Sequence, residues 1–211
     1  MFITFEGGEG SGKSTQVKLL AEYFKKQGRK VILTREPGGT ETAEKIREML
    51  LTDANLTPLE QCLLNFAARL DHVENLIKPA LEKGSVVISD RFFDSTYAYQ
   101  GAGQGLAISK IKAIHKAAIG NFKPDITFIL DIDPKKGIAR AKARGKTNHY
   151  DNAKLEFHNK IRAAFLGIAT KNKRRCKVID ASGEAEAVFA AILVIANPTL
   201  NLIQGSGEAI Q

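Results

Sequence analysis

The segment at residues 7–14 constrains the fold of this 211-residue chain more than any other feature. It reads Gly-Gly-Glu-Gly-Ser-Gly-Lys-Ser and matches the pattern G-x-x-x-x-G-K-[ST]. Residues 2–5 are mostly apolar and predict a strand, and the apolar positions of residues 14–27 recur at helical spacing. A glycine-rich loop between a strand and a helix is typical of a phosphate-binding site in an α/β protein.

Strands and helices go on alternating after this loop. The run at residues 126–132 is almost continuously apolar between two prolines, which is typical of a strand buried on both faces of a sheet. The alternation predicts an α/β fold of the P-loop NTP hydrolase type, a three-layer sandwich in which a parallel sheet carries helices on both faces. Further strands are predicted at residues 31–34, 85–89 and 178–179, and further helices at residues 42–51, 58–81 and 109–119.

The length of the chain fits a single domain covering residues 1–211. Residues 143–154 are polar, lack an apolar period and interrupt two helical segments, so we predict a short mobile lid there. The tail at residues 197–211 contains Gly205, Ser206 and Gly207 and is expected to be frayed.

Charge and composition narrow the partners of the chain. The formal net charge is +8, but the densest basic cluster, residues 171–177, contains no aromatic side chain. We therefore expect a solvated helix end there and no nucleic-acid partner. No segment reaches the roughly 18 apolar residues of a membrane span and no leader precedes the loop, so we expect no membrane partner and a cytoplasmic protein. Cys62 and Cys176 have neither metal-ligand nor redox spacing, which fits a reducing compartment.

The loop at residues 7–14 carries the chemistry expected of a triphosphate site. Its glycines let backbone N–H groups point inward at an anion, and the following helix adds a favourable dipole. Lys13 is placed to reach the β- and γ-phosphates, and the Ser14 hydroxyl is a ligand for Mg²⁺. No Asn-Lys-x-Asp sequence is present, which argues against a GTPase. We expect ATP to be bound by Gly7, Gly8, Glu9, Gly10, Ser11, Gly12, Lys13, Ser14 and Thr15.

Polar motifs stand where the second and third predicted strands end. Arg35-Glu-Pro-Gly-Gly-Thr40 predicts a rigid turn flanked by a cation and a carboxylate. The alternative is an ordinary loop with exposed charges. Asp90-Arg91 offers a carboxylate for a metal shell and a guanidinium for a phosphate, the alternative being a surface ion pair. Because an open α/β sheet binds ligands at the carboxyl ends of its strands, we expect both motifs to face the loop.

An aromatic side chain and an arginine share one face of the helix predicted at residues 58–81. Phe66 lies three residues before Arg69, so its ring could stack on a base beside a guanidinium contact. A helical phenylalanine is more often part of the core, and that alternative stays open.

Transfer of a phosphoryl group to an oxygen that is already anionic needs no histidine base. We therefore interpret His72, His115 and His158 as surface or helix-face residues.

Taken together, these motifs resemble those of bacterial thymidylate kinases. The resemblance covers about residues 1–180, and the segments Thr34-Arg-Glu-Pro-Gly-Gly-Thr40 and Tyr97-Ala-Tyr-Gln-Gly101 are more specific to that family than the phosphate loop. It implies a usually homodimeric P-loop enzyme that uses Mg²⁺ to transfer the γ-phosphoryl group of ATP to dTMP, giving dTDP. The alternatives are a related P-loop kinase for another nucleotide or deoxynucleoside, and a DNA-partitioning type of P-loop ATPase.

The resemblance also implies roles for individual residues. Lys13 would serve ATP, Arg91 would clamp the dTMP phosphate, and Glu9 would face the 3′-hydroxyl of the acceptor. We add the hypothesis that Arg144 supplies positive charge when the lid closes. The residues implied near Mg²⁺ are Ser14 and Asp90.

A dTMP site is implied by position in the same motifs. Arg69 and Gln100 would read the edge of thymine, and Tyr99 would crowd the 2′ position so that ribose is disfavoured. In the family the aromatic residue that stacks on the base usually lies four residues before the arginine. In this chain that position is Asn65, and Phe66 lies only three residues before Arg69. The dTMP set is Glu36, Pro37, Arg47, Phe66, Arg69, Arg91, Thr96, Tyr99 and Gln100.

Overall fold

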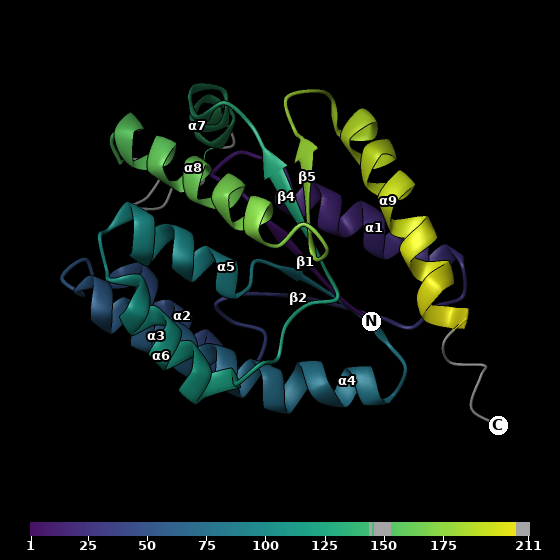
Figure 1. Ribbon diagram of the computed structural model, residues 1–211, viewed down its shortest axis with the longest axis horizontal. Coiled ribbons are helices and arrows are strands. Elements are labelled where there is room, and N and C mark those ends of the chain that lie inside the picture. The colour runs from purple at the N-terminus through teal and green to yellow at the C-terminus, as the bar shows by residue number, and fades with distance from the viewer. Residues whose placement is uncertain (144, 146–152, 206–211) are drawn as a thin grey trace.

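A sheet of five parallel strands forms the centre of the computed structural model (Figure 1). The structure describes residues 1–143, 145 and 153–205, with side chains in the last helix only as far as Ala196. Within these residues the strand order is β2-β3-β1-β4-β5. The strands are β1 (Phe2–Glu6), β2 (Val31–Arg35), β3 (Val86–Asp90), β4 (Ile126–Asp131) and β5 (Cys176–Asp180).

Helices connect the strands and cover both faces of the sheet. They include two π-helical segments, η1 and η2, each continuing an α-helix without a break. The helices are α1 (Lys13–Lys26), α2 (Glu41–Thr52), α3 (Pro58–His72), η1 (Val73–Ile77), α4 (Lys78–Glu82), α5 (Phe93–Thr96), η2 (Tyr97–Gly103), α6 (Ile108–Ile119), α7 (Pro134–Ala143), α8 (Leu155–Lys171) and α9 (Ala185–Gly205).

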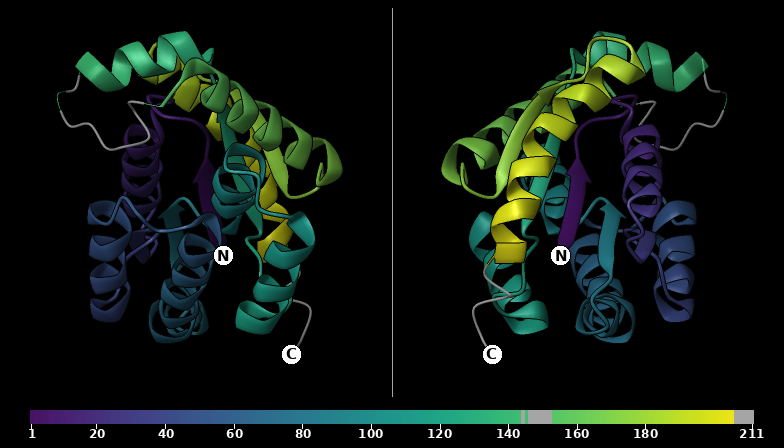
Figure 2. Two further views of the ribbon diagram at one scale, coloured as in Figure 1. Left: turned by 90° about the vertical axis from the view of Figure 1, so that its left-hand side faces the viewer. Right: turned by 90° about the vertical axis from the view of Figure 1, so that its right-hand side faces the viewer.

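Side-chain alternation along the strands sorts the core into two sides. Ile3 and Phe5 pack with α1 and α9, which lie side by side in Figures 1 and 2. Phe2 and Val87 point to the other face, where α3, η1 and α6 cover them, while α8 packs on Ile129 further along that face. Because successive residues of a strand face opposite sides, one short apolar strand contributes to both cores. The predicted three-layer α/β sandwich is confirmed.

The long predicted helix at residues 58–81 is present as α3, η1 and α4 in sequence. Thr57 caps its start by accepting a hydrogen bond from the backbone N–H of Glu60, and the Glu60 side chain accepts one from the backbone N–H of Thr57. Pro58 occupies the first turn, where its missing N–H costs nothing. These two features explain why the helix begins where the sequence predicts.

One expectation from the sequence needs revision at the C-terminal part of the chain. The last strand is longer than the predicted residues 178–179, because β5 pairs with β4 from Cys176 to Asp180. The tail expected to fray from residue 197 includes the last turns of α9, which ends at Gly205, and the expectation of fraying stays a prediction. The segment predicted as a lid lies between α7 and α8, and most of it falls outside the described residues. In the described part of the chain, no helix has the length and apolar content needed to cross a membrane.

The strand register brings polar residues together at one edge of the sheet. Asp90 of β3 lies opposite Phe5 of β1 and opposite Arg35 of β2. Glu6, at the end of β1, is followed directly by the glycine-rich loop. The carboxyl ends of β1, β2 and β3 therefore place the loop, the turn after β2 and the Asp90-Arg91 motif around one site, as predicted.

Candidate functional site

The glycine-rich loop wraps around the ammonium group of Lys13. Lys13 Nζ donates hydrogen bonds to the backbone oxygens of Gly7 at 3.0 Å and Gly8 at 2.8 Å, and it lies 3.3 Å from Ser11 Oγ. Gly10 has a positive φ of 67° and packs so closely against Gly137 of α7 that a Cβ atom would collide with the backbone there. The backbone of the loop can follow this path only with glycine at position 10.

Lys13 lies almost completely inside the site, with 8% of its surface exposed. Its burial, and then the neighbouring Arg91 guanidinium, lower the pKa of the ammonium group to about 8, while the carboxylates of Glu9 and Asp90 oppose the shift. Lys13 is held by neutral carbonyl oxygens, and no carboxylate of the described residues pairs with it directly. Such a cation is well suited to meet an anionic ligand.

Ser14 and Asp90 place two hard oxygen ligands beside the loop. Ser14 Oγ donates a hydrogen bond to Asp90 Oδ2 at 2.7 Å. Mg²⁺ is usually held by one or two protein oxygens together with waters and substrate phosphates, so this pair fits a magnesium ion that also binds a triphosphate. Among the described residues there is no group of three or more His, Cys, Asp or Glu side chains arranged as a metal site.

The backbone of Arg91 is held in an unusual conformation. Its φ of 74° lies in the left-handed region, which a residue with a Cβ adopts only at an energetic cost. Three hydrogen bonds fix this turn: Arg91 N–H donates to Phe5 O, Ser89 Oγ donates to Arg91 O, and the N–H of Phe92 donates to Glu6 Oε1. The turn directs the Arg91 side chain back over the loop.

The Arg91 guanidinium connects the loop to η2. Its Nη2 donates to Glu9 Oε1 at 2.9 Å and to the Tyr99 hydroxyl at 3.0 Å, while Nη1 contacts Gly7 O at 3.2 Å and Ser95 Oγ at 3.1 Å. The Tyr99 hydroxyl also donates to Glu9 Oε1. Glu9, Arg91 and Tyr99 therefore form one group at the edge of the cleft, and all three are residues to which the family resemblance gave roles at the acceptor.

Glu6 is a buried carboxyl group that the sequence analysis missed. It accepts hydrogen bonds from Phe92 N–H at 2.8 Å and from the Ser95 hydroxyl at 2.6 Å. Complete burial, followed by the nearby Asp94 carboxylate, raises the pKa of Glu6 to about 8. Its place at the end of β1, directly before the loop, was the available signal.

The loop and the Asp90-Arg91 motif share a cleft of about 350 Å³ with the turn after β2 and with η2. Most of the predicted site residues line it, namely Glu9, Gly10, Ser11, Gly12, Lys13, Ser14, Thr15, Glu36, Pro37, Arg47, Asp90, Arg91, Thr96, Tyr99 and Gln100. Gly7 and Gly8 belong to the loop but line a smaller hollow behind it. Arg144 lies outside the described residues. The cleft also includes residues absent from the predicted set, namely Arg35, Leu50, Leu51, Asn65 and Ser95.

Positive charge gathers on the turn side of this cleft. Arg47 donates from Nη1 to Pro37 O at 2.7 Å, which fixes its head beside the turn. Arg35 pairs with Glu44 at 3.0 Å while both side chains remain largely exposed. Exposed ion pairs are weak, so an incoming phosphate can compete for the Arg35 guanidinium.

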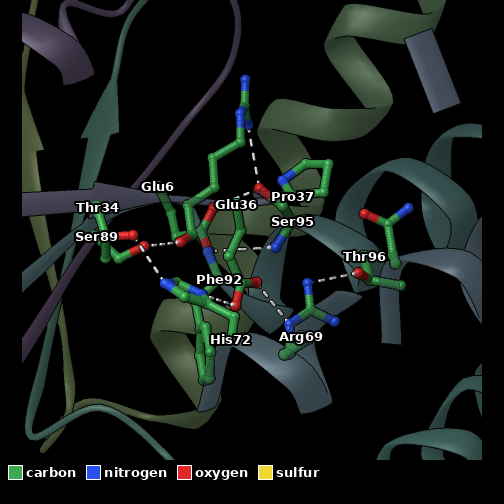
Figure 3. A network of polar contacts seen from close by, with 12 residues as sticks. Glu6, Thr34, Glu36, Pro37, Arg69, His72, Ser89, Phe92, Ser95 and Thr96 are labelled. Carbon is green, nitrogen blue, oxygen red and sulfur yellow. Dashed lines mark hydrogen bonds and ion pairs between the residues drawn. The ribbon is translucent and has the colours of Figure 1, made fainter. Parts of the chain in front are cut away.

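Arg69 lies directly behind two side chains that line the cleft (Figure 3). Its Nε donates to Glu36 Oε2 at 2.7 Å and its Nη2 donates to Thr96 Oγ1 at 3.3 Å. Only 2% of Arg69 is exposed, and within the described structure its Nη1 has no hydrogen-bond partner. Burying a guanidinium while one of its donors makes no hydrogen bond costs free energy, unless a bound ligand accepts a hydrogen bond from that donor.

Phe66 does not occupy the position that the sequence analysis considered for a stacking ring. It is 1% exposed, belongs to the core beneath the cleft and contacts Arg69, whose Cζ lies 4.6 Å from the ring centroid. Asn65 lines the cleft instead, because neighbouring helix positions point about 100° apart. The alternative of a core phenylalanine is thus the one that the structure supports.

Phe66→Ala is therefore expected to act mainly on stability. Removing a buried phenylalanine costs about 3–5 kcal/mol of unfolding free energy, because the transfer energy is lost and a cavity remains. Urea unfolding of this variant and of Asn65→Ala gives the comparison. We expect Asn65→Ala to lose less than about 1 kcal/mol, the scale of a solvent-facing substitution. Equal losses in the two variants would contradict the assignment of Phe66 to the core.

The interpretation of the histidines as surface or helix-face residues is wrong for His72. This side chain is completely buried and contacts both Thr34 and Glu36. His158 is also buried, with 6% of its surface exposed, while His115 lies among aromatic rings and has its pKa lowered to about 4 by burial. Sequence alone gave no sign of these contacts because the partners of His72 are 36 and 38 residues away.

The chain is similar to known proteins over most of its length. The family model described as thymidylate kinase matches residues 5–192. A thymidylate kinase of Caulobacter vibrioides is 49% identical over 90% of this chain and 93% of its own length. One of Wolbachia pipientis is 52% identical over 92% of this chain and 94% of its own. The crystal structure of thymidylate kinase from Ehrlichia chaffeensis has a TM-score of 0.77 and 40% identity, covering 93% of this chain and 98% of that one.

Proposed function

Because the chain belongs to the thymidylate kinase family, we propose that it is an enzyme that transfers the γ-phosphoryl group of ATP to dTMP, giving dTDP and ADP. The observation that carries the proposal is the shared cleft. The triphosphate loop lines one part of it, and Glu36, Thr96 and Gln100 line another, with Arg91 between them. Phosphoryl transfer depends on such positioning and on charge neutralisation more than on a base.

In this proposal the donor and the metal occupy the loop side of the cleft. The backbone amides of the loop and Lys13 bind the phosphates of ATP, and Ser14 and Asp90 hold Mg²⁺. When bound, Mg²⁺ neutralises charge that builds up on the phosphate oxygens. For Arg144 we keep our hypothesis from the sequence that it adds positive charge near the transferred group.

The acceptor occupies the side formed by the turn after β2 and by η2. Arg91 and Arg47 line this side of the cleft and attract the dTMP phosphate. Arg69 lies behind Glu36 and Thr96, and by the family resemblance we assign its unpartnered Nη1 donor to a carbonyl oxygen of thymine. Gln100 and Thr96 adjoin that contact, whereas Phe66 supports Arg69 from below and does not stack on the base. We also propose that the enzyme is a homodimer, as the family resemblance implies, and that it works in the cytoplasm, as we expect from the sequence.

Tyr99→Ala is expected to weaken the selection of deoxyribose over ribose. The Tyr99 ring lines the cleft and is 6% exposed, so its removal opens space beside the sugar. We expect the ratio of kcat/KM for dTMP over its ribonucleotide counterpart to fall by the equivalent of about 1–3 kcal/mol. Tyr99→Phe is the matched control, because it keeps the ring and removes only the hydroxyl bonds to Arg91 and Glu9. An unchanged ratio in Tyr99→Ala would mean that another residue excludes the 2′-hydroxyl.

A coupled assay of ADP release tests the function as a whole. Purified protein with ATP and Mg²⁺ is given dTMP, dUMP, dCMP, dGMP or UMP in turn. The proposal expects the highest kcat/KM with dTMP. Fast turnover with another acceptor would favour a related P-loop kinase. Hydrolysis that rises with added DNA and needs no acceptor would favour a DNA-partitioning type of ATPase.

A further inference from the structure

His72 connects the edge of the sheet to the acceptor side of the cleft through a buried chain of contacts (Figure 3). One ring nitrogen, Nε2, lies 2.8 Å from Thr34 Oγ1 of β2, and the other, Nδ1, lies 3.0 Å from Glu36 Oε1. The histidine is completely buried, and Glu36 is 4% exposed. Buried polar groups of this kind are stable only when their hydrogen bonds are made, so the two contacts fix the plane of the ring.

The partners of the ring determine which nitrogen carries the proton. The Glu36 carboxylate, which is paired with Arg69, can only accept, so His72 Nδ1–H donates to it. A neutral ring can then accept the Thr34 hydroxyl proton at Nε2, and both ring nitrogens are satisfied. His72 thus orients one oxygen of Glu36 while the other oxygen remains for Arg69.

Glu36 passes this orientation on to Arg69. The Glu36 oxygen not used by His72 accepts from Arg69 Nε at 2.7 Å. Because an arginine is planar, fixing Nε also fixes the direction of the unpartnered Nη1 donor. The side chains of the pair are each 2% exposed, so water cannot easily replace either partner.

The turn after β2 leaves the ring little freedom. Gly39 has a positive φ of 94°, and a Cβ at this position would collide with Thr34 Oγ1 and with His72 Nε2. The next residue, Thr40, is held to α3 by a hydrogen bond to Asp71. The turn is therefore packed against the end of α3 at two neighbouring points, and His72 cannot rotate without displacing it.

We propose that His72 is a positioning residue for the acceptor, which acts through Glu36 to hold the Arg69 guanidinium behind Glu36 and Thr96 on the acceptor side of the cleft. The proposal rests on the proposed function, because it is the base of dTMP that Arg69 would meet. His72 does not line the cleft, so its effect must be indirect. It should change acceptor binding and base selection and leave ATP binding intact.

Two amide substitutions separate the contacts of the ring. His72→Asn places an amide donor near the position of Nδ1 and keeps the contact with Glu36, whereas His72→Gln reaches the position of Nε2 and keeps the contact with Thr34. We expect His72→Gln to raise the KM for dTMP by about 10- to 100-fold, the cost of a displaced group near the reacting centre. His72→Asn should stay much closer to the wild type, and neither variant should change the KM for ATP.

Base selection and non-additivity distinguish positioning from a general loss of structure. In His72→Gln the ratio of kcat/KM for dTMP over dCMP should fall, because thymine offers an accepting carbonyl where cytosine offers an amino group. In a protein that already carries Glu36→Gln, the further change His72→Gln should raise the KM for dTMP only a little, because the residue through which His72 acts is already altered. Thermal melting of every variant shows whether the fold is kept.

The outcomes are distinct. Equal KM values for dTMP in His72→Asn and His72→Gln, or full additivity with Glu36→Gln, would overturn the inference. Similar increases in the KM for ATP and in the KM for dTMP would also overturn it, because they would indicate a structural role alone. If His72→Gln does not fold, the KM of His72→Asn and of Glu36→Gln with dTMP and dCMP decides the question. Absence of wild-type turnover with dTMP would instead contradict the proposed function.

Discussion

Lys13→Ala is expected to lower kcat by at least about 10²–10³-fold, the loss seen when one preorganised donor to a developing negative charge is removed. Lys13 is the ammonium group at the centre of the loop, where carbonyl oxygens and a hydroxyl hold it. In the proposed function this ammonium group meets the phosphates of ATP. Stopped assays with saturating ATP and dTMP measure the effect on kcat directly.

The fold should survive this substitution. Lys13 contributes an unfavourable buried charge, as its lowered pKa of about 8 indicates. The apolar core on the inner face of α1 is formed by Val17, Leu20, Ala21 and Phe24. We expect the melting temperature of Lys13→Ala to equal or exceed that of the wild type. Lys18→Ala is the matched control, because Lys18 lies exposed on the same helix. Normal kcat in Lys13→Ala would remove the basis for assigning the loop to ATP.

The sequence was sufficient to predict the parts of the site that depend on local chain geometry. The loop, the turn after β2 and Asp90-Arg91 each follow a strand, and parallel strands deliver their carboxyl ends to one edge. A motif at the end of such a strand has its position determined by the fold. Glu9 in the loop and Arg91 after β3 are brought together in this way, and both contact Tyr99 of η2, whose place at the site was implied only by the family resemblance.

The parts that failed depend on helix rotation and on distant partners. Asn65 and Phe66 differ by one position, yet one lines the cleft and the other lies in the core. Helical periodicity predicts how wide the apolar face of a helix is. It does not predict which residue at the edge of that face lines the cleft, because this depends on how the helix is rotated about its axis. His72 shows the second difficulty, because a polar side chain on a helix is normally solvated unless partners far along the chain bury it.

Arg91→Ala is expected to lower kcat by about 10³-fold or more, which is the lower end of the effect of an arginine that neutralises a transferred phosphoryl group. The guanidinium is poised between the loop and η2 and holds Glu9 and Tyr99 at the same time. Arg174→Ala removes the same charge from an exposed turn and serves as the control for the overall charge of the protein.

The backbone at Arg91 makes the interpretation of this variant unusually direct. Alanine keeps a Cβ, so the left-handed φ of 74° costs about the same in both proteins and the three hydrogen bonds of the turn remain. A loss of kcat in Arg91→Ala then reports the missing guanidinium and not a relaxed turn. Arg91→Gly relieves the strain as well, and we expect it to be more stable than Arg91→Ala and equally inactive. If Arg91→Ala kept full kcat, the charge that meets the transferred group would have to come from elsewhere in the cleft, and the bridging position of Arg91 would be structural alone.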